Sequence, residues 1–373
     1  MNCALRKRLT LFSRQCQHEL VPLTEADFGQ TLTTPMQQLL RIFEMVEIER
    51  WVPSSKGCVG RPPRERHALA RAFVAKAVLG LSLTIDLIER LRVDRLLRRL
   101  CGFDMRSNRS LNQALFSRAF AEFAQSQLAS RVHEQVVRAN MGDALVCHLS
   151  MDSTAIEVRE KPVSKVKPKS EADPAPRKRG RPRKHEVRPP PAPTRIERQL
   201  AGMSLEQMLA DLPTPCDVGT KRNAQGYKES WIGYKLHLNV ADGMIPVAAI
   251  LTSASVHDSQ AAVPLTQMSA GRVTSLYDLR DAAYCSPLLR QHSQSLGHVP
   301  LFDHNPRGGE KIEFAPHQAM RYRERSTVER VNARVKDDFG ARRIHVRGHA
   351  KVLAHLMFGV LALTAEQLMR WLT

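Results

Sequence analysis

The sequence has no closely spaced pair of cysteines and no long apolar run. Its seven cysteines are scattered, and none belongs to a C-x-x-C pair. This argues against a disulfide framework and a zinc site, and it indicates a reducing cytosol. No run of about 18 uncharged apolar residues exists, so no membrane span is predicted. The first residues also lack the apolar core of a signal peptide, and we expect a cytoplasmic protein.

Acidic residues are too few to balance the basic ones. The 56 Lys and Arg residues outnumber 37 Asp and Glu, which gives a net charge of +19. Such a field favours a polyanion, either a nucleic acid or an anionic membrane face, over a merely soluble basic protein. The 373 residues, 43% of them hydrophobic, suffice for two or three domains with sizeable cores.

The first part of the chain, residues 1–140, reads as an all-helical N-terminal domain. Apolar residues recur at helical spacing, and we expect helices over about 64–80, 84–100 and 110–139. Arginines are spread over their outer faces. The domain could therefore dock on DNA ends or form a dimerisation bundle, and the sequence does not choose between the two.

The pattern changes to an α/β one in residues 141–373. A period-two apolar run, "ALVCHLSMDSTAIEV", predicts a strand, and Asp242-Gly243 between two further apolar runs predicts a hairpin. Helical and strand-like segments then alternate to the end of the chain. We expect a mixed sheet flanked by helices.

A basic, proline-rich insert interrupts this second part at about 159–215. Residues 159–195 alone contain 13 Lys or Arg, 4 Asp or Glu and 9 Pro, which predicts disorder. Within "RKRGRPRK", Arg179 and Arg181 could enter the minor groove of A·T-rich DNA. Alternatively, the insert is a solvated linker that adds only affinity for phosphates.

A carboxylate near the middle of the first strand is the first candidate for chemistry. Asp152 needs a partner there, which is either a local hydrogen-bond donor or a metal ion. A metal site would require a second carboxylate. Four lie near strand ends, and physical reasoning alone leaves the choice open: Asp258, Asp278, Asp281 and Asp303.

The stretch "YRERSTVERVNARVK" predicts a helix with an unusual polar stripe. Tyr322, Arg325, Glu329 and Lys336 fall within about 60° of arc at 100° per residue, beside an apolar face. An exposed i,i+4 salt bridge accounts for Arg325 and Glu329 at about 0.3–0.5 kcal/mol. It does not account for the other two residues.

These four residues resemble the signature Y-x-x-R-x-x-x-E-x-x-x-x-x-x-K of one group of DDE transposases of bacterial insertion sequences. The segments "MDST", "GYKLHL", "TSASVHDSQ" and "DAAY" are similar to further blocks of that family. The resemblance covers roughly residues 140–370, and it implies a ribonuclease-H-like fold.

Carried over by motif, the resemblance implies a catalytic, metal-binding triad of Asp152, Asp281 and Glu329. Asp281 is chosen because "DAAY" matches the family block D-x-G-Y, with Ala283 in place of the usual glycine; Asp278 is the second choice. The function of the basic insert does not carry over.

The implied reaction is cleavage at the ends of an insertion sequence and joining of the freed 3′-hydroxyls to target DNA. Two Mg²⁺ ions, or Mn²⁺, would serve it, because such ions prefer carboxylate oxygens. Arg325 and Lys336 would grip phosphates, and Tyr322 would stack on a base or bond a phosphate. The expected partners are the terminal inverted repeats, target DNA and a second copy of the chain in a dimer or larger synaptic complex. The alternatives are a catalytically retired DNA-binding protein and a nuclease without strand transfer.

Overall fold

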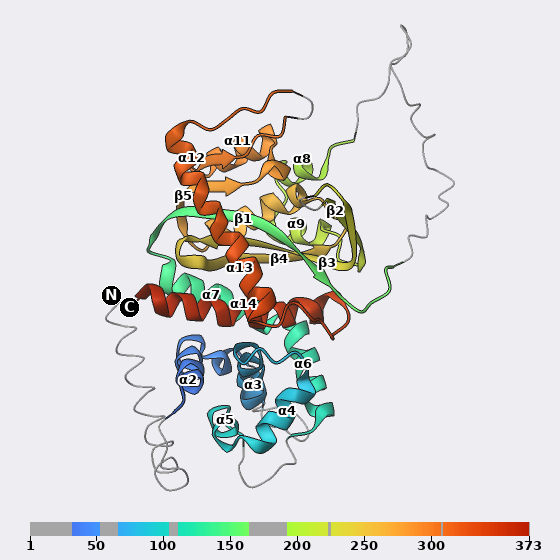
Figure 1. Ribbon diagram of the computed structural model, residues 1–373, viewed down its shortest axis with the longest axis vertical. Coiled ribbons are helices and arrows are strands. Elements are labelled where there is room, and N and C mark those ends of the chain that lie inside the picture. Colours follow the sequence, from blue (N-terminus) through green and yellow to red (C-terminus); the bar gives the residue numbers. More distant parts are fainter. Residues whose placement is uncertain are drawn as a thin grey trace.

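A computed structural model describes residues 32–52, 66–103, 111–163, 192–222, 225–306 and 309–372. Helices form its N-terminal region, and a mixed sheet with helices on both faces forms the rest (Figure 1). The α/β architecture predicted from the sequence is therefore confirmed.

The sheet has six strands. Their order is β2-β3-β1-β5-β6, and β4 pairs with β3. β1 is antiparallel to β3 and parallel to β5, which is parallel to β6. The strand bounds are β1 Leu145–Glu157, β2 Asp217–Arg222, β3 Lys228–Ala241, β4 Ile245–Ser253, β5 Thr274–Arg280 and β6 Val299–Phe302. The predicted hairpin is confirmed, because β3 and β4 join at Asp242-Gly243 with Gly243 at a φ of +75°.

Two groups of helices cover the sheet. On one face, α8–α11 pack on apolar residues such as Met151 and Ile250, and on the other lie α7, α13 and α14. Their bounds are α7 Leu128–Met141, α8 Arg195–Leu200, α9 Leu205–Asp211, α10 Ala262–Ala270, α11 Pro287–Ser295, α12 Pro316–Tyr322, α13 Ser326–Asp337 and α14 His349–Leu372.

The N-terminal helices are shorter than the sequence suggested. Their bounds are α2 Thr34–Val46, α3 Arg66–Val78, α4 Thr84–Val93, α5 Arg95–Leu100 and α6 Gln113–Gln125. The expected helix over 84–100 breaks at Asp94, whose side chain caps α5 by accepting from Leu97 N at 2.9 Å. The expected helix over 110–139 breaks at Gln127, which has a φ of +50°.

The helix α14 joins the two parts of the molecule. It lies between the sheet and the N-terminal helices (Figure 1) and contacts α2, α3, α6, α7 and β4. By length and composition it could cross a membrane, but most of its residues are buried inside the protein. The ring of Phe358 on α14 packs against the N-terminal helices, with its centroid 5.7 Å from the ring centroid of Phe73. The two parts therefore share one apolar core.

The expectation of disorder over 159–215 is wrong at its C-terminal end. Two short helices, α8 and α9, follow the N-cap residues Thr194 and Ser204, each of which forms a capping box with the residue three positions later. Met208 and Leu212 are buried against the sheet, and β2 follows at Asp217. Local capping and a few apolar side chains outweigh the average composition here. Residues 164–191, including Arg179 and Arg181, lie outside the described residues.

Buried neutral histidines make the stability depend on pH. On α7, His133 lies with its Nε2 3.0 Å from the carbonyl oxygen of Pro246, and its Nδ1 has no partner among the described residues. Burial lowers the pKa of His133 to about 3, and that of His355 on α14 to about 4. Both rings must therefore be neutral in the folded protein.

We expect the free energy of unfolding to fall as the pH drops below about 6.5. A histidine with a depressed folded pKa contributes stability that is present above its unfolded pKa and is lost below it. By pH 5 the loss is roughly 2 kcal/mol for each histidine. Urea denaturation at pH 7.5 and pH 5 measures it, and His133→Gln should remove part of the dependence. Changing the exposed His67 to Gln should leave the pH dependence unchanged. An equal effect of both variants would contradict the explanation.

Candidate active site

Two aspartates lie side by side in the interior of the sheet, where β5 ends beside β1. The parallel register of β1 and β5 pairs Met151 with Arg280, so Asp152 in β1 lies beside Asp281, the residue that directly follows β5. Asp152 is largely buried, and Asp281 accepts a hydrogen bond from Ala283 N at 3.0 Å. Strand pairing alone therefore brings together two residues that are far apart in the sequence.

A third carboxylate comes from α13, which crosses the sheet in Figure 1. The buried Val328, Val331 and Val335 hold this helix against β1 and β3. The predicted apolar face is thus confirmed, and Glu329 stands beside it with 57% of its side chain exposed. The helix is not continuous back to Tyr322, because a 3₁₀ turn over Arg323–Arg325 separates α12 from α13.

One guanidinium group lies among the three carboxylates. Arg325 Nη1 is 2.6 Å from Glu329 Oε1, and Nη2 is 3.5 Å from Asp152 Oδ1 and 3.8 Å from Asp281 Oδ2. Burial alone would lower the pKa of Arg325, but these anions hold it above its usual value. The i,i+4 salt bridge between Arg325 and Glu329, which the sequence offered as the simpler explanation of these two residues, does exist. It is one part of a larger cluster.

The protonation of Asp152 is set by its burial. Desolvation raises its pKa to about 6, with the Arg325 charge opposing and the Asp281 charge adding to the rise. Burial also raises the pKa of Asp281. A second cation facing these groups would offset the cost of ionising them.

The carboxylates offer only oxygen ligands, which suits a hard divalent ion such as Mg²⁺ or Mn²⁺. Three of them already converge on a cationic group, Arg325, and the Nε of that residue has no hydrogen-bond partner among the described residues. With Arg325 between them, the three carboxylates are not close enough to one another to share an ion. No other group of three or more His, Cys, Asp or Glu side chains in the described part of the chain is close enough either. The residue types fit a metal site once Arg325 gives up its contacts with the three carboxylates.

An asparagine that sequence reasoning missed fixes the orientation of Asp152. Asn332 on α13 donates from Nδ2 to Asp152 Oδ2 at 2.9 Å. It lies three residues after Glu329, at an angle between the polar stripe and the apolar face. That intermediate angle was the signal that could have identified it.

The other three candidate aspartates have other partners. Asp278 is buried with Arg280, Ser293 and His298, which hold its pKa below the usual range although burial opposes this. Asp303 lies 3.3 Å from Lys311 Nζ.

Asp258 pairs with Lys235 Nζ at 2.9 Å. Burial would raise its pKa, but the charges of His237 and Lys235 hold it below its usual value. Its charge reaches Asp152 and Asp281, so Asp258 borders the carboxylate cluster.

Tyr322 and Lys336 lie outside the carboxylate cluster. The Tyr322 hydroxyl donates to the Arg280 carbonyl oxygen at 3.2 Å and so ties α12 to the end of β5. Lys336 is seven residues beyond Glu329 on α13, and burial together with the nearby Lys221 and Arg342 lowers its pKa. The structure thus gathers Asp152, Asp281, Arg325 and Glu329, and leaves Lys336 in a separate basic group.

Comparison with known proteins gives two family matches. Residues 146–365 match the family described as Transposase DDE domain. Residues 27–122 match the family described as Transposase domain (DUF772). No curated protein matches the chain, and no solved structure matches it.

Proposed function

The chain belongs to the DDE transposases of insertion sequences, and we propose that it binds the ends of such an element, cuts there and joins the freed 3′-hydroxyls to target DNA. Its mixed sheet, preceded by helices, is the ribonuclease-H-like fold of that family. The observation that supports the reaction best is the meeting of Asp152, Asp281 and Glu329 around Arg325. We also assign the chain to the group with the Y-R-E-K signature.

In this proposal Asp152, Asp281 and Glu329 are the catalytic carboxylates and would hold two Mg²⁺ ions, or Mn²⁺. Bound ions would supply charge stabilisation to the attacking and leaving oxygens of a phosphodiester. Asp152 is preferred as a ligand because Asn332 fixes one of its oxygens. Asp281 is preferred to Asp278, whose carboxylate already neutralises a buried arginine.

Arg325 would grip the strand being cut. Its planar guanidinium can form two parallel hydrogen bonds with a phosphate, and it is held at the centre of the cluster before DNA arrives. Its movement onto a phosphate would release all three carboxylates at once. Lys336, further along the chain on α13, would contact a phosphate beyond the cut.

We assign Tyr322 a positioning part in addition to its predicted contact with a base or phosphate. Its hydroxyl is engaged with the end of β5, next to Asp281. The ring lies 4.8 Å from Phe314, so one face is supported by an aromatic neighbour. Loss of the hydroxyl would therefore loosen the strand end that carries a catalytic carboxylate.

The test is DNA cleavage and strand transfer by the purified full chain. The substrate is a labelled duplex that carries the inverted repeat flanking the gene, and a shuffled duplex serves as the control. We expect Mg²⁺-dependent nicks at the repeat end and joined products, both lost on addition of EDTA. Cuts without joined products would indicate a nuclease, and binding without cuts would indicate a retired DNA-binding protein.

A further inference from the structure

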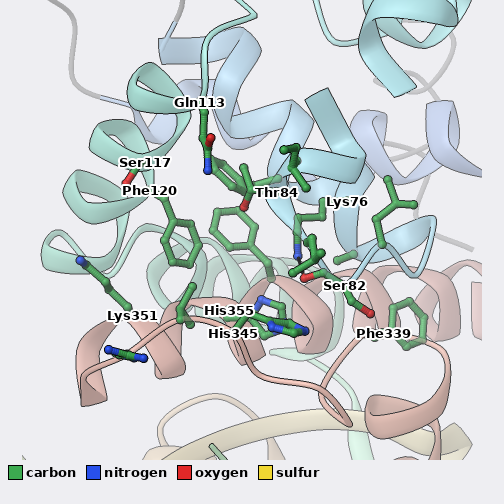
Figure 2. Close-up of a pocket in the computed structure, with 18 residues that line it drawn as sticks. Lys76, Ser82, Thr84, Gln113, Ser117, Phe120, Phe339, His345, Lys351 and His355 are labelled. Atoms are coloured by element: carbon green, nitrogen blue, oxygen red, sulfur yellow. Dashed lines mark hydrogen bonds between the residues drawn. The ribbon is translucent and has the colours of Figure 1, made fainter. Parts of the chain in front are cut away.

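A cavity of about 460 Å³ lies between the N-terminal helices and α14, away from the carboxylate cluster. One wall comes from α3, α6 and residues 81–85, and the other from α14 and residues 339–347. Figure 2 shows Lys76 on the first wall and His345 and His355 on the second facing the same space. Its volume suits a ligand of the size of one nucleotide.

The charge of the lining has one sign. Lys76, Arg347 and Lys351 contribute to it, the two histidines of the lining are polar, and none of the described residues that line it is acidic. Arg347 and Lys351 are exposed at the rim. A lining with only cations and neutral groups favours an anionic ligand.

The strongest single observation is the burial of Lys76. Only 6% of this residue is exposed, and its Nζ donates to the carbonyl oxygen of Ser82 at 2.9 Å. Within the described part of the chain, no salt bridge involves it. Burial lowers its pKa to about 8, although the charge of Asp86 opposes this. A buried ammonium group has three donors, and an anion in the cavity would compensate the cost of its burial.

The remaining lining groups suit a flat, polar ring. Phenyl rings of Phe120, Phe339 and Phe358 contribute apolar surface, and Gln113 and Ser117 contribute polar side chains. Aromatic side chains stack on any nucleobase, and an amide can form hydrogen bonds with its edge. Inorganic phosphate would use only the cationic part of this lining.

We propose that this cavity binds a nucleoside phosphate, with the phosphate against Lys76 and the base among the phenyl rings. The nucleotide is either free or an unpaired one within a DNA strand. The second source is within reach, because Phe339 in the lining follows the last turn of α13, the helix that carries Glu329. The separation along that helix from Glu329 to its end is about 12 Å. The inference does not depend on the catalytic assignments.

The experiment measures equilibrium binding to the purified full chain without metal ions. The probes are dAMP, deoxyadenosine, inorganic phosphate, a blunt duplex and the same duplex with a three-nucleotide overhang. We expect dAMP to bind more tightly than phosphate or deoxyadenosine. Lys76→Met should weaken the binding of dAMP by about tenfold or more, because a charged hydrogen-bond donor to the phosphate is lost.

Two further variants keep the result independent of folding defects. Arg347→Gln changes an exposed rim residue and should weaken dAMP binding by a smaller factor. Arg118→Gln changes an exposed arginine of α6 outside the lining and should have no effect. Urea denaturation verifies that each variant is folded.

The probes distinguish the two sources of the nucleotide. Binding of dAMP that is lost in Lys76→Met supports a free nucleotide. An overhang-dependent gain in DNA affinity that is lost in Lys76→Met, without binding of dAMP, supports a nucleotide within a strand. The proposal is overturned if Lys76→Met changes neither, or if inorganic phosphate binds as tightly as dAMP.

Discussion

Asp152→Asn is expected to lower the rate of DNA cleavage by about 10³-fold or more, because the loss of a proposed metal ligand would remove several kcal/mol of charge stabilisation in the transition state. DNA affinity should be unchanged or slightly stronger, since one negative charge facing the phosphates disappears. The substitution keeps the size of the side chain. Single-turnover cleavage of the labelled repeat duplex, together with its binding curve, measures both quantities.

The same result is expected for Asp281→Asn and Glu329→Gln. Glu324→Gln is the matched control, because this carboxylate is exposed and lies next to Arg325 in the chain but outside the cluster. It should cleave at close to the wild-type rate. A cleavage rate for Asp152→Asn near that of the control would refute the catalytic assignment.

Asp278→Ala is expected to lower the free energy of unfolding by about 3–5 kcal/mol. Asp278 and Arg280 are each about 1% exposed, and the carboxylate also accepts from Ser293 Oγ at 2.6 Å. Removal of the anion leaves the guanidinium charge buried without its partner. Urea denaturation at pH 7.5 provides the measurement.

The comparison with Asp281→Asn separates a structural aspartate from the one proposed to be catalytic. Burial raises the pKa of Asp281, so removal of its charge should leave the stability unchanged or increase it. If instead Asp281→Asn retains cleavage and a folded Asp278→Ala is inactive, the second catalytic aspartate is Asp278. A stable Asp278→Ala would also contradict the explanation of its buried ion pair.

Much of the sheet could be predicted from the sequence, because its signals are local. The apolar alternation around Asp152 and the Asp242-Gly243 turn can each be recognised from neighbouring residues alone. The short strand β2 was missed, since it is mostly exposed and is defined by its pairing with β3. Likewise, α8 and α9 are short, and the prolines and basic residues before them dominated the average composition.

The candidate site was predictable only in part. The polar stripe predicted over residues 322–336 gave Arg325 and Glu329 together, because helical spacing fixes their angle. The choice of Asp281 came from the family resemblance, since physical reasoning left four aspartates open. The register that sets Asp281 beside Asp152 depends on strand pairing between segments 129 positions apart in the sequence. Asn332 could not be predicted either, because its contact with Asp152 depends on the packing of α13 against β1.

The position of α14 late in the chain has a consequence for how the protein is made. A ribosome completes the N-terminal helices long before it reaches Phe358, whose ring packs against Phe73 and Phe120. During synthesis those two rings therefore lack their final neighbour. The N-terminal helices reach their finished packing only when almost the whole chain has emerged, so a chain whose synthesis stops early lacks the helix that completes the shared core.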